Sequence, residues 1–384
     1  MSNLFPTYAR WEVEPERAEG SYLYGKDGKK YLDFTSGIGV CNLGHRPAAV
    51  EEAVQAQLKK FWHVSNLFPV GIQETAAEKL AKAAGLDLVF FANSGAEANE
   101  AAIKLARKAT GRKKIITFFQ SFHGRTYATM SATGQDKIKT GYGPMLETFT
   151  YVPFNDLKGL EAEMSNEVAA VMLEVIQGEG GLHPADSDFL KGVENLCKKH
   201  GALFVIDEVQ TGNGRTGKPF AFQHYGLNPD IVSTAKGLGS GFPIGAIIGK
   251  ESLKEFFGPG SHGTTFGGNP LAVSAAIATM DIIFNEEFLA NVNQKADFLK
   301  SCLKENLQSL SIVNEIRGLG LMIGIEINQS AAPILADLRA AGFIALSAGE
   351  QVIRLLPPLT VTEDELQQAV EIIANILKEK VKTA

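Results

Sequence analysis

Two stretches near the middle of the 384-residue chain decide the fold: ALFVIDEVQTGNGRTG (202–217) and DIVSTAKGLGSG (230–241). Each begins with a short apolar run and continues into a loop rich in glycine and polar residues. This pattern is typical of buried strands whose carboxyl ends lead into loops. Ligands bind at the carboxyl ends of strands in a parallel sheet. Asp207 and Lys236, at the ends of the two runs, are therefore the first candidates for a functional site.

Apolar runs alternate with helical patterns through the middle of the chain, which predicts strands joined by crossovers in a mainly parallel sheet. One helical pattern extends from about Ala96 to Ala109, and another extends from Ser187 to His200 and ends at Gly201, a good C-terminal cap. The predicted strands are LVFFA (88–92), KIITFF (114–119), AAVMLEVI (169–176), ALFVID (202–207), DIVSTA (230–235) and GAIIG (245–249). The predicted fold class is therefore α/β.

The pattern changes after Pro270, where a long apolar helix, LAVSAAIATMDII (271–283), leads into a mixture of helices and strands. Near the C-terminus, the residues Thr362-Glu-Asp-Glu365 form a capping box that predicts the start of a last amphipathic helix. The hairpin-like stretch YLYGKDGKKYLDF (22–34) either belongs with this C-terminal part or covers the main domain. We expect three units: an N-terminal segment (1–45), a large domain (46–270) and a smaller α+β domain (271–384).

Composition and spacing exclude several classes of protein. The net charge of −6 is spread along the chain without a block of like charge, so neither a nucleic-acid nor a membrane partner is expected. No run of about 18 apolar residues and no signal peptide is present. The cysteines Cys41, Cys197 and Cys302 are far apart, and the histidines lack zinc-binding spacing. We therefore expect a cytoplasmic protein that binds small molecules and holds no metal.

Asp207 and Lys236 each have an ordinary interpretation as well as a functional one. A carboxylate at the end of a buried strand has lost water and needs a compensating partner, which a structural ion pair would supply. A desolvated lysine has a lowered pKa, as an amine nucleophile requires, although most lysines are simply solvated loop residues. Their places one crossover apart, at the ends of strands, favour a shared site.

Two further strand ends carry groups that suit a ligand. The turn NSGA (93–96) leads into a helix whose first amides can bind phosphate, although the same turn also caps an ordinary helix. Phe122 can cover a flat ring and Arg125 can bind a carboxylate; the alternative is a core aromatic and a surface ion pair. An amine, an acid, a phosphate site, an aromatic plate and an arginine together favour pyridoxal 5'-phosphate (PLP) as cofactor.

The chain resembles the class III aminotransferases, PLP enzymes of fold type I, over nearly its whole length. The segments that match the family occur in the family's order. They are NSGAEANE (93–100), SFHGRT (121–126), GEGG (178–181), DEVQTGNGRTG (207–217), STAKGLGSGFPIGA (233–246), HGTTFGGNP (262–270) and IRLLPP (353–358). The resemblance implies a large domain around a mainly parallel sheet and a smaller α+β domain formed by both termini.

The resemblance also implies a role for each matching residue around the cofactor ring. Lys236 would form the Schiff base with PLP and then act as base and acid in a 1,3-proton shift. Asp207 would keep the pyridine nitrogen protonated. Phe122 and Val209 would enclose the ring, while Gln210 would bond its phenolic oxygen.

The phosphate would be held by Ser94, Gly95 and Ala96, as the resemblance implies, and by Thr265 from a second subunit. A residue supplied by a second subunit implies a homodimer with the site at the interface.

The resemblance implies that the substrates are amino acids and 2-oxo acids. Arg354 would bind the α-carboxylate of glutamate and 2-oxoglutarate, and Glu179 would neutralise Arg354 when a terminal amine enters. Arg125, with Thr264 nearby, would bind the carboxylate of the amine donor. Ile38 stands where relatives that act on ornithine typically have a tyrosine. A small apolar residue there suits an acylated amine, although Ile38 could instead be core packing.

The implied reaction is the transamination of N2-acetyl-L-ornithine with 2-oxoglutarate, giving N-acetyl-L-glutamate 5-semialdehyde and L-glutamate in arginine biosynthesis. Ornithine, succinylornithine and 4-aminobutyrate are alternative donors. Outside the class, a glutamate-semialdehyde aminomutase and a non-catalytic nucleotide-binding module are the alternatives. Asn213, which stands where many relatives have an apolar residue, is expected at the entrance of the site.

Overall fold

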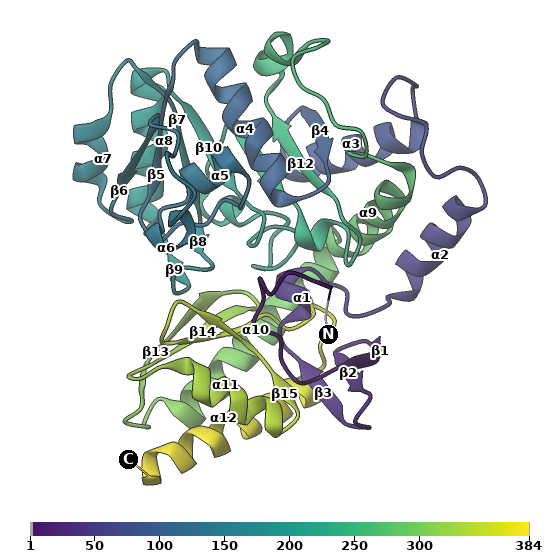
Figure 1. Cartoon of the computed structure of the whole chain (residues 1–384), viewed down its shortest axis with the longest axis vertical. Helices are drawn as coiled ribbons and strands as arrows, with labels where there is room; N and C mark the ends of the chain where they lie inside the picture. The colour runs from purple at the N-terminus through teal and green to yellow at the C-terminus, as the bar shows by residue number, and fades with distance from the viewer. Residues whose placement is uncertain (1–2, 384) are drawn as a thin grey trace.

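The computed structural model describes residues 3–383 and has an upper and a lower part, as Figure 1 shows. The upper part is built on one sheet, whose strands are β4 (Leu88–Ala92), β5 (Lys114–Phe118), β6 (Phe149–Val152), β7 (Val168–Glu174), β10 (Leu203–Asp207), β11 (Ile231–Thr234) and β12 (Gly245–Gly249). Their order across the sheet is β4-β12-β11-β10-β7-β5-β6. The crossovers of an α/β fold produce this order.

The sheet is mainly parallel, as predicted, but β12 runs antiparallel to both of its neighbours, β11 and β4. All six predicted strands are present, with ends within about two residues of the prediction. The strand β6 was not predicted, because FTYV is only four residues long.

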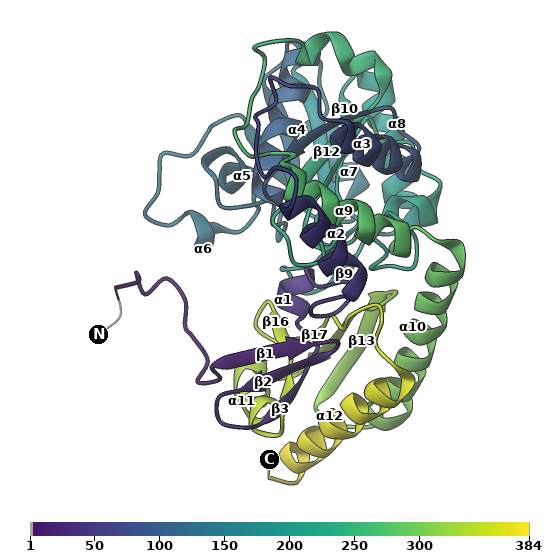
Figure 2. The same ribbon diagram turned by 90° about the vertical axis from the view of Figure 1, so that its right-hand side faces the viewer.

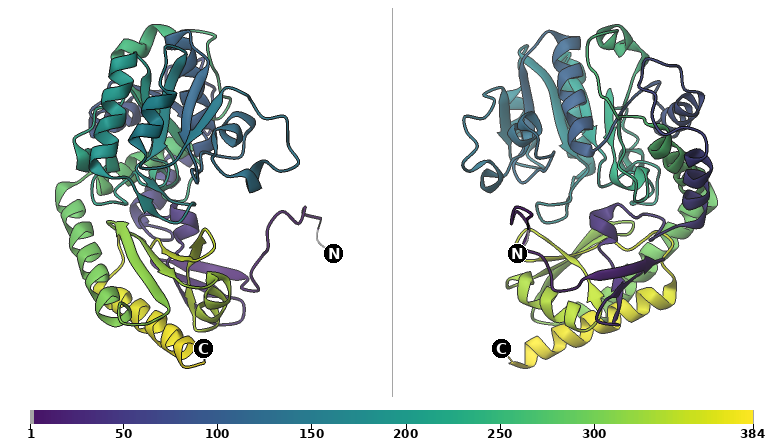
Figure 3. Two further views of the ribbon diagram at one scale, coloured as in Figure 1. Left: turned by 90° about the vertical axis from the view of Figure 1, so that its left-hand side faces the viewer. Right: turned by 45° about the vertical axis from the view of Figure 1, so that its right-hand side comes forward.

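Both faces of the sheet are buried, which explains the continuous apolar runs. Along β7, Val171 and Leu173 enter one core, while Ala170 and Met172 enter the other. The helices that cover these faces are seen in Figure 3. The first core is covered by α3 (Gly71–Ala84), α8 (Ser187–His200) and α9 (Pro270–Ile283), and the second by α4 (Gly95–Thr110). The helix α8 ends, as predicted, at Gly201 in the left-handed conformation.

The lower part contains an antiparallel sheet of β13 (Val313–Leu319), β14 (Met322–Ile327), β17 (Val352–Leu355) and β16 (Leu346–Ala348). It packs with α10 (Glu286–Leu307), α11 (Ala331–Ala340) and α12 (Glu363–Thr383). The predicted capping box is formed: Thr362 N donates to Glu365 Oε2 at 2.9 Å, and Glu365 N donates to Thr362 Oγ1 at 3.2 Å.

The N-terminal strands lie in the lower part, beside the C-terminal third of the chain (Figure 2). A sheet is formed by β1 (Pro15–Glu19), β2 (Tyr22–Gly25), β3 (Lys30–Asp33) and β15 (Phe343–Ile344). β2 and β3 form the hairpin, and β3 pairs in parallel with β15. We keep the division into residues 1–45, 46–270 and 271–384 as a proposal. The pairing of β3 with β15 supports its first boundary, whereas α9 packs on a core of the upper part and so lies on the other side of the second boundary.

The remaining elements lie mostly in connections. They are α1 (Ser36–Gly39), α2 (Ala48–Leu58), α5 (Tyr127–Ala132), α6 (Asp136–Lys139), α7 (Leu157–Glu163), β8 (Ile176–Gln177) and β9 (His183–Pro184), with the 3-10 helices η1 (Ala221–Tyr225), η2 (Lys236–Leu238) and η3 (Glu251–Phe257). Among residues 3–383, no helix is long and apolar enough to cross a membrane.

A fully buried arginine joins three segments that are far apart in the sequence. Arg215 donates from Nη2 to Asn42 Oδ1 at 2.8 Å and from Nη1 to the carbonyl oxygens of Leu321, at 3.1 Å, and of Pro357. Burial lowers the pKa of Arg215 to about 9. The N-terminal segment, the loop after β10 and the C-terminal strands therefore meet at one guanidinium.

Candidate active site

A cavity of about 500 Å³ lies at the carboxyl ends of β4, β5, β10 and β11. This volume is in the range of small-ligand sites, about 300–1,000 Å³. The cavity brings together most of the predicted site residues: Ser94, Gly95, Ala96, Phe122, Arg125, Glu179, Asp207, Val209, Gln210 and Lys236. Residues that are widely separated in the sequence thus converge at one edge of the sheet.

Asp207 ends β10 as a buried carboxylate surrounded by hydrogen-bond donors. Its Oδ2 atom lies 2.8 Å from His123 Nδ1 and 2.7 Å from Asn99 Nδ2, and its Oδ1 atom accepts from Val209 N at 3.0 Å. Burial opposes protonation of His123, but Asp207 and Glu174 outweigh it and raise the pKa of His123. These donors offset the loss of water from the carboxylate.

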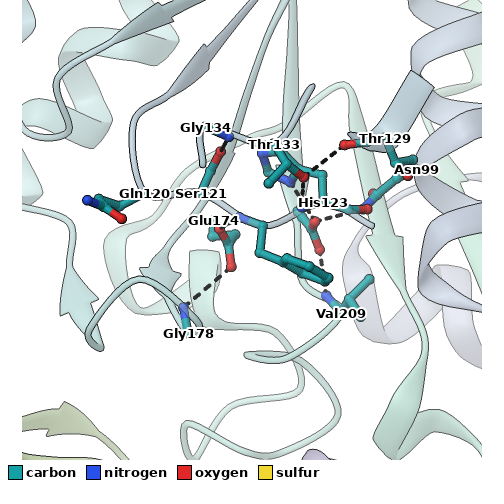
Figure 4. A network of polar contacts seen from close by, with 12 residues as sticks. Asn99, Gln120, Ser121, His123, Thr129, Thr133, Gly134, Glu174, Gly178 and Val209 are labelled. Atoms are coloured by element: carbon teal, nitrogen blue, oxygen red, sulfur yellow. Dashed lines mark hydrogen bonds and ion pairs between the residues drawn. The ribbon is translucent and has the colours of Figure 1, made fainter. Parts of the chain in front are cut away.

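Glu174, at the end of β7, is a second buried acid in the wall of the cavity. Figure 4 shows it near His123, with Gly178 N donating to Oε1 at 3.4 Å; Phe122 N donates to Oε2 at 2.9 Å. Burial raises the pKa of Glu174 to about 8, and the charge of Asp207 acts in the same direction. Glu174 therefore keeps its proton to a higher pH than an exposed glutamate does.

Lys236 begins η2, directly after β11, with a positive φ of 43°. A positive φ is costly for a residue with a side chain and persists where the surroundings hold it. Burial lowers the pKa of Lys236; Glu179 opposes this effect and Arg354 adds to it. The structure therefore gives Lys236 the environment of an amine nucleophile.

The N-terminus of α4 forms part of the cavity wall. Ser94 is the N-cap, and its Oγ atom accepts from Glu97 N at 3.2 Å, while Gly95 and Ala96 supply the first amides of the helix. A Cβ at Gly95 would lie 2.6 Å from Val209 Cγ1, so only glycine lets Val209 pack over this helix end. The free amides and the helix dipole make the position suitable for a phosphate group.

Glu179, which lines the cavity, forms an ion pair with the buried Arg354, which lies outside the cavity lining; we call the two residues the gate pair. Arg354 Nη1 lies 2.6 Å from Glu179 Oε1, and Nη2 lies 3.3 Å from Oε2. Gln210 joins both partners: its Nε2 donates to Glu179 Oε1, and its Oε1 accepts from Arg354 Nη1, each at 3.1 Å. Burial disfavours the charge of Glu179, but Arg354 outweighs this and holds the pKa of Glu179 below its usual value.

Thr264 and Thr265 lie outside this cavity within a single chain. Both line a separate cavity of about 490 Å³, and Thr264 Oγ1 accepts from Asn93 Nδ2 at 3.2 Å. Arg125 is exposed, with its Cζ atom 6.0 Å from the centre of the Phe122 ring. The structure of one chain therefore does not place Thr264 beside Arg125.

The burial of two residues near the site differs from a simple expectation. Asn213 is fully buried rather than at an entrance, so that prediction is wrong; its Nδ2 atom donates to Thr234 Oγ1 at 2.9 Å and to Ala235 O at 3.1 Å. It thereby ties the loop after β10 to the residue before Lys236. Ile38 is 48% exposed, which rules out core packing in the single chain.

His123, Asn99 and Glu174 also line the cavity, although no sequence motif predicted a role for them. His123 could have been found, because it lies in SFHGRT, directly after a predicted strand. Asn99 lies one turn into α4 and Glu174 lies inside an apolar run, so neither has a local signal. No group of His, Cys, Asp or Glu within residues 3–383 is arranged to hold a metal ion.

Residues 7–377 match the family model described as aminotransferase class-III. The chain belongs to this family. It is 59% identical over 371 residues to the acetylornithine aminotransferase of Bacillus subtilis (strain 168), with 96% of each chain covered. The family membership confirms the predicted resemblance and the assignment as a PLP-dependent aminotransferase.

Two solved structures of related enzymes share the fold. The ornithine aminotransferase of Toxoplasma gondii ME49 has a TM-score of 0.96 at 29% identity, covering 100% of this chain and 94% of that one. The N-acetylornithine aminotransferase of Stenotrophomonas maltophilia K279a has a TM-score of 0.86 at 36% identity, with 98% of each chain covered. Enzymes with different donors in their names share this backbone, so the fold alone does not select the donor.

Proposed function

We propose that this aminotransferase transfers the terminal amino group of N2-acetyl-L-ornithine to 2-oxoglutarate, giving N-acetyl-L-glutamate 5-semialdehyde and L-glutamate in arginine biosynthesis. The observation that carries the proposal is the gate pair, in which Arg354 binds Glu179, a residue that lines the same cavity as Lys236. The identity to acetylornithine aminotransferases over nearly the whole chain supports the choice of donor.

The gate pair suits an enzyme whose two substrates differ at this point. Arg354 would bind the α-carboxylate of 2-oxoglutarate after Glu179 has moved aside. When the donor presents its terminal amine, Glu179 would return and neutralise Arg354. An unpaired buried cation is costly, so a partner on the protein lowers the cost of binding a substrate without a carboxylate there.

The residues of the cavity fit PLP, with an acid, an amine and free helix amides placed around it. When bound, PLP supplies an aldehyde that accepts amino groups and a ring that stabilises negative charge. The Lys236 amine would hold the cofactor and carry the proton between carbon atoms. Asp207 would hold a proton on the ring nitrogen.

The other side chains would position the cofactor and the donor. Phe122 and Val209 would flank the ring, and Gln210 would bond its phenolic oxygen. Ser94, Gly95 and Ala96 would bind the phosphate through the N-terminus of α4. On the donor side, Arg125 would bind a carboxylate; Thr264 of the same chain lines a separate cavity.

The acyl group of the donor would lie toward α1. Val40 lines the cavity, and Ile38, two residues earlier, presents an exposed apolar side chain. An apolar side chain suits an acetylated nitrogen, whereas a free α-ammonium needs a polar partner. This arrangement favours an acylated donor over ornithine.

Comparison of four donors tests the assignment. We expect kcat/KM for N-acetylornithine to exceed that for ornithine by about 10- to 100-fold, the range that one mismatched group in a pocket produces. Steady-state kinetics with 2-oxoglutarate would also include succinylornithine and 4-aminobutyrate. In the variant Ile38→Tyr we expect a smaller ratio of kcat/KM for N-acetylornithine to kcat/KM for ornithine. A preference for free ornithine would reject the acetyl assignment, and turnover without added 2-oxoglutarate would indicate an aminomutase.

We also propose a homodimer that completes each site with Thr265 of the partner chain. Large apolar side chains are exposed on the segment before α3 and near Thr265: Trp62, Leu67, Phe68 and Phe266. Leu67 is 90% exposed, and such a patch is typical of an interface. The cytoplasm suits the enzyme, because Cys41, Cys197 and Cys302 are all free thiols.

Sedimentation should give twice the mass of one chain at micromolar concentration. Phe68→Asp should lower this mass, because it places a charge in the apolar patch. Gln308→Asp, which adds the same charge at the exposed end of α10, serves as the control. A single-chain mass for the unmodified protein throughout the concentration range would exclude the dimer.

A further inference from the structure

The segment that carries Glu179 follows β8 in the upper part but is held by residues of the lower part. We call residues 178–182 the gate segment. At its start, Arg354 Nη1 donates to Gly178 O at 2.8 Å. In its middle, Gly349 N donates to Glu179 O at 3.0 Å. Two contacts from the lower part thus fix the backbone on both sides of the Glu179 side chain.

A third contact, made by Arg317 of β13, holds the end of the gate segment. Its Nε atom donates to Gly181 O and Leu182 O, each at 3.1 Å, and its Nη2 atom donates to Gly181 O at 2.6 Å. Arg317 is buried, and its charge is compensated by Glu315 at 2.7 Å and by Glu326. One guanidinium therefore clamps two consecutive carbonyl groups.

The clamped backbone is in a conformation that needs support. Leu182 has a φ of 53°, in the left-handed region that a leucine rarely adopts. Its side chain is fully buried, and its N–H donates to Gln177 O at 3.1 Å. Such strain persists only where the surroundings hold it, and it concentrates at switching sites. Arg317 supplies that support at the carbonyl group of the strained residue.

We propose that Arg317 is a positioning residue for the substrate switch, because it holds the backbone beyond Glu179 in place. With the backbone fixed, the switch between the two substrates is a motion of the Glu179 side chain alone. The inference rests on the proposed function, which makes the gate pair the point of substrate choice. The hydrogen bonds and ion pairs of Arg317 join it to the backbone of Gly181 and Leu182 and to Glu315 and Glu326, so it acts on Glu179 through the backbone.

Loss of the clamp has opposite effects on the two substrates. If the gate segment drifts, Glu179 pairs less well with Arg354, and the donor meets an incompletely neutralised cation. The donor half-reaction becomes slower. A dicarboxylate, in contrast, competes with a weaker partner for Arg354 and binds more tightly. A residue that only stabilises the fold would weaken both.

The test compares Arg317→Met with Arg317→Lys in the holoenzyme. Lysine keeps the charge without the planar fork that reaches two carbonyl groups, and a cavity of about 570 Å³ beside Arg317 leaves room for either side chain. The matched control is Arg112→Met, because Arg112 Nη1 also ties two carbonyl groups, Val168 O at 3.0 Å and His200 O at 2.8 Å. Val168 begins β7 and His200 ends α8, whereas the gate segment lies in the connection between the end of β7 and the start of α8.

Three quantities are measured: the single-turnover rate with N-acetylornithine, the calorimetric Kd of glutarate, and the Tm. In Arg317→Met we expect the donor rate to fall by about 3- to 30-fold and the glutarate Kd to fall as well, the range that one coupling residue produces. For Arg317→Lys, the donor rate and the glutarate Kd should both lie between those of Arg317→Met and those of the unmodified enzyme. Arg112→Met should lower the Tm and leave unchanged the ratio of the donor rate to the Kd of glutarate.

The outcomes separate this inference from the proposed function. If the donor rate and glutarate affinity of both Arg317 variants fall together, or neither changes, Arg317 has no positioning role. If Arg112→Met shifts the ratio as much as Arg317→Met, the effect is one of stability and the inference is wrong. If the unmodified enzyme rejects N-acetylornithine but glutarate binding still tightens in Arg317→Met, the donor assignment fails while the positioning role is supported.

Discussion

Lys236→Ala is expected to lower turnover by about 10⁴-fold or more, because it removes the nucleophilic amine and the proton carrier together. The pKa of Lys236 is lowered by burial, and its backbone has a positive φ at the end of β11. No neighbouring lysine lines the cavity within the described chain, so no other amine can take its place. Single-turnover kinetics with saturating donor would measure the loss.

A second measurement identifies the attachment of the cofactor. The unmodified protein should show an absorbance band near the visible edge that borohydride removes, with the label on Lys236. Lys250→Ala is the control, because Lys250 follows β12 and pairs with Asp230 at 2.7 Å, away from the cavity. Activity of Lys236→Ala within tenfold of the unmodified enzyme, or a borohydride label on another residue, would overturn the assignment.

Asp207→Asn is expected to lower turnover by about 10²- to 10³-fold, the usual effect of removing one preorganised electrostatic contact. The amide has the shape of the carboxylate but no charge to hold a proton on the cofactor ring. It also leaves His123 buried with a weakened partner, since Asp207 contributes most of the interactions that raise the pKa of this imidazole against the effect of burial.

Glu208→Gln is the matched control for this carboxylate. Glu208 is the next residue and is also buried, but it accepts from Thr211 Oγ1 at 2.6 Å and Phe222 N at 2.8 Å, away from the cavity. Stopped-flow kinetics and the absorbance of the bound cofactor would be compared for both variants. A larger loss in Glu208→Gln than in Asp207→Asn would contradict the assignment.

The strands were predictable where a buried apolar run ends in a turn, as in LVFFA (88–92) and ALFVID (202–207). The reversed direction of β12 was not predictable, because GAIIG reads the same in a parallel or an antiparallel strand. β6 was missed because it lies at the edge of the sheet and is too short for a pattern. Local sequence indicates burial, and it does not record the neighbours of a strand.

The candidate site was predictable to the extent that its residues end strands. Asp207 and Lys236 could be paired because both follow apolar runs one crossover apart. Asn99 and Glu174 could not be linked to Asp207 by any spacing, since their contact arises only when β7, β10 and α4 pack together. Asn213 was misplaced because an amide in a polar loop gives no sign of its burial.

The burial of Arg215 also constrains the order in which distant segments of the chain can come together. Asn42 precedes Arg215 by 173 residues, whereas the carbonyl groups of Leu321 and Pro357 follow it by 106 and 142 residues. If Arg215 were enclosed before those carbonyl groups reached it, its guanidinium would be a desolvated cation with unmet donors, which is costly. Docking of the segment around Asn42 onto Arg215 is therefore stable only when the segments around Leu321 and Pro357 are also in place.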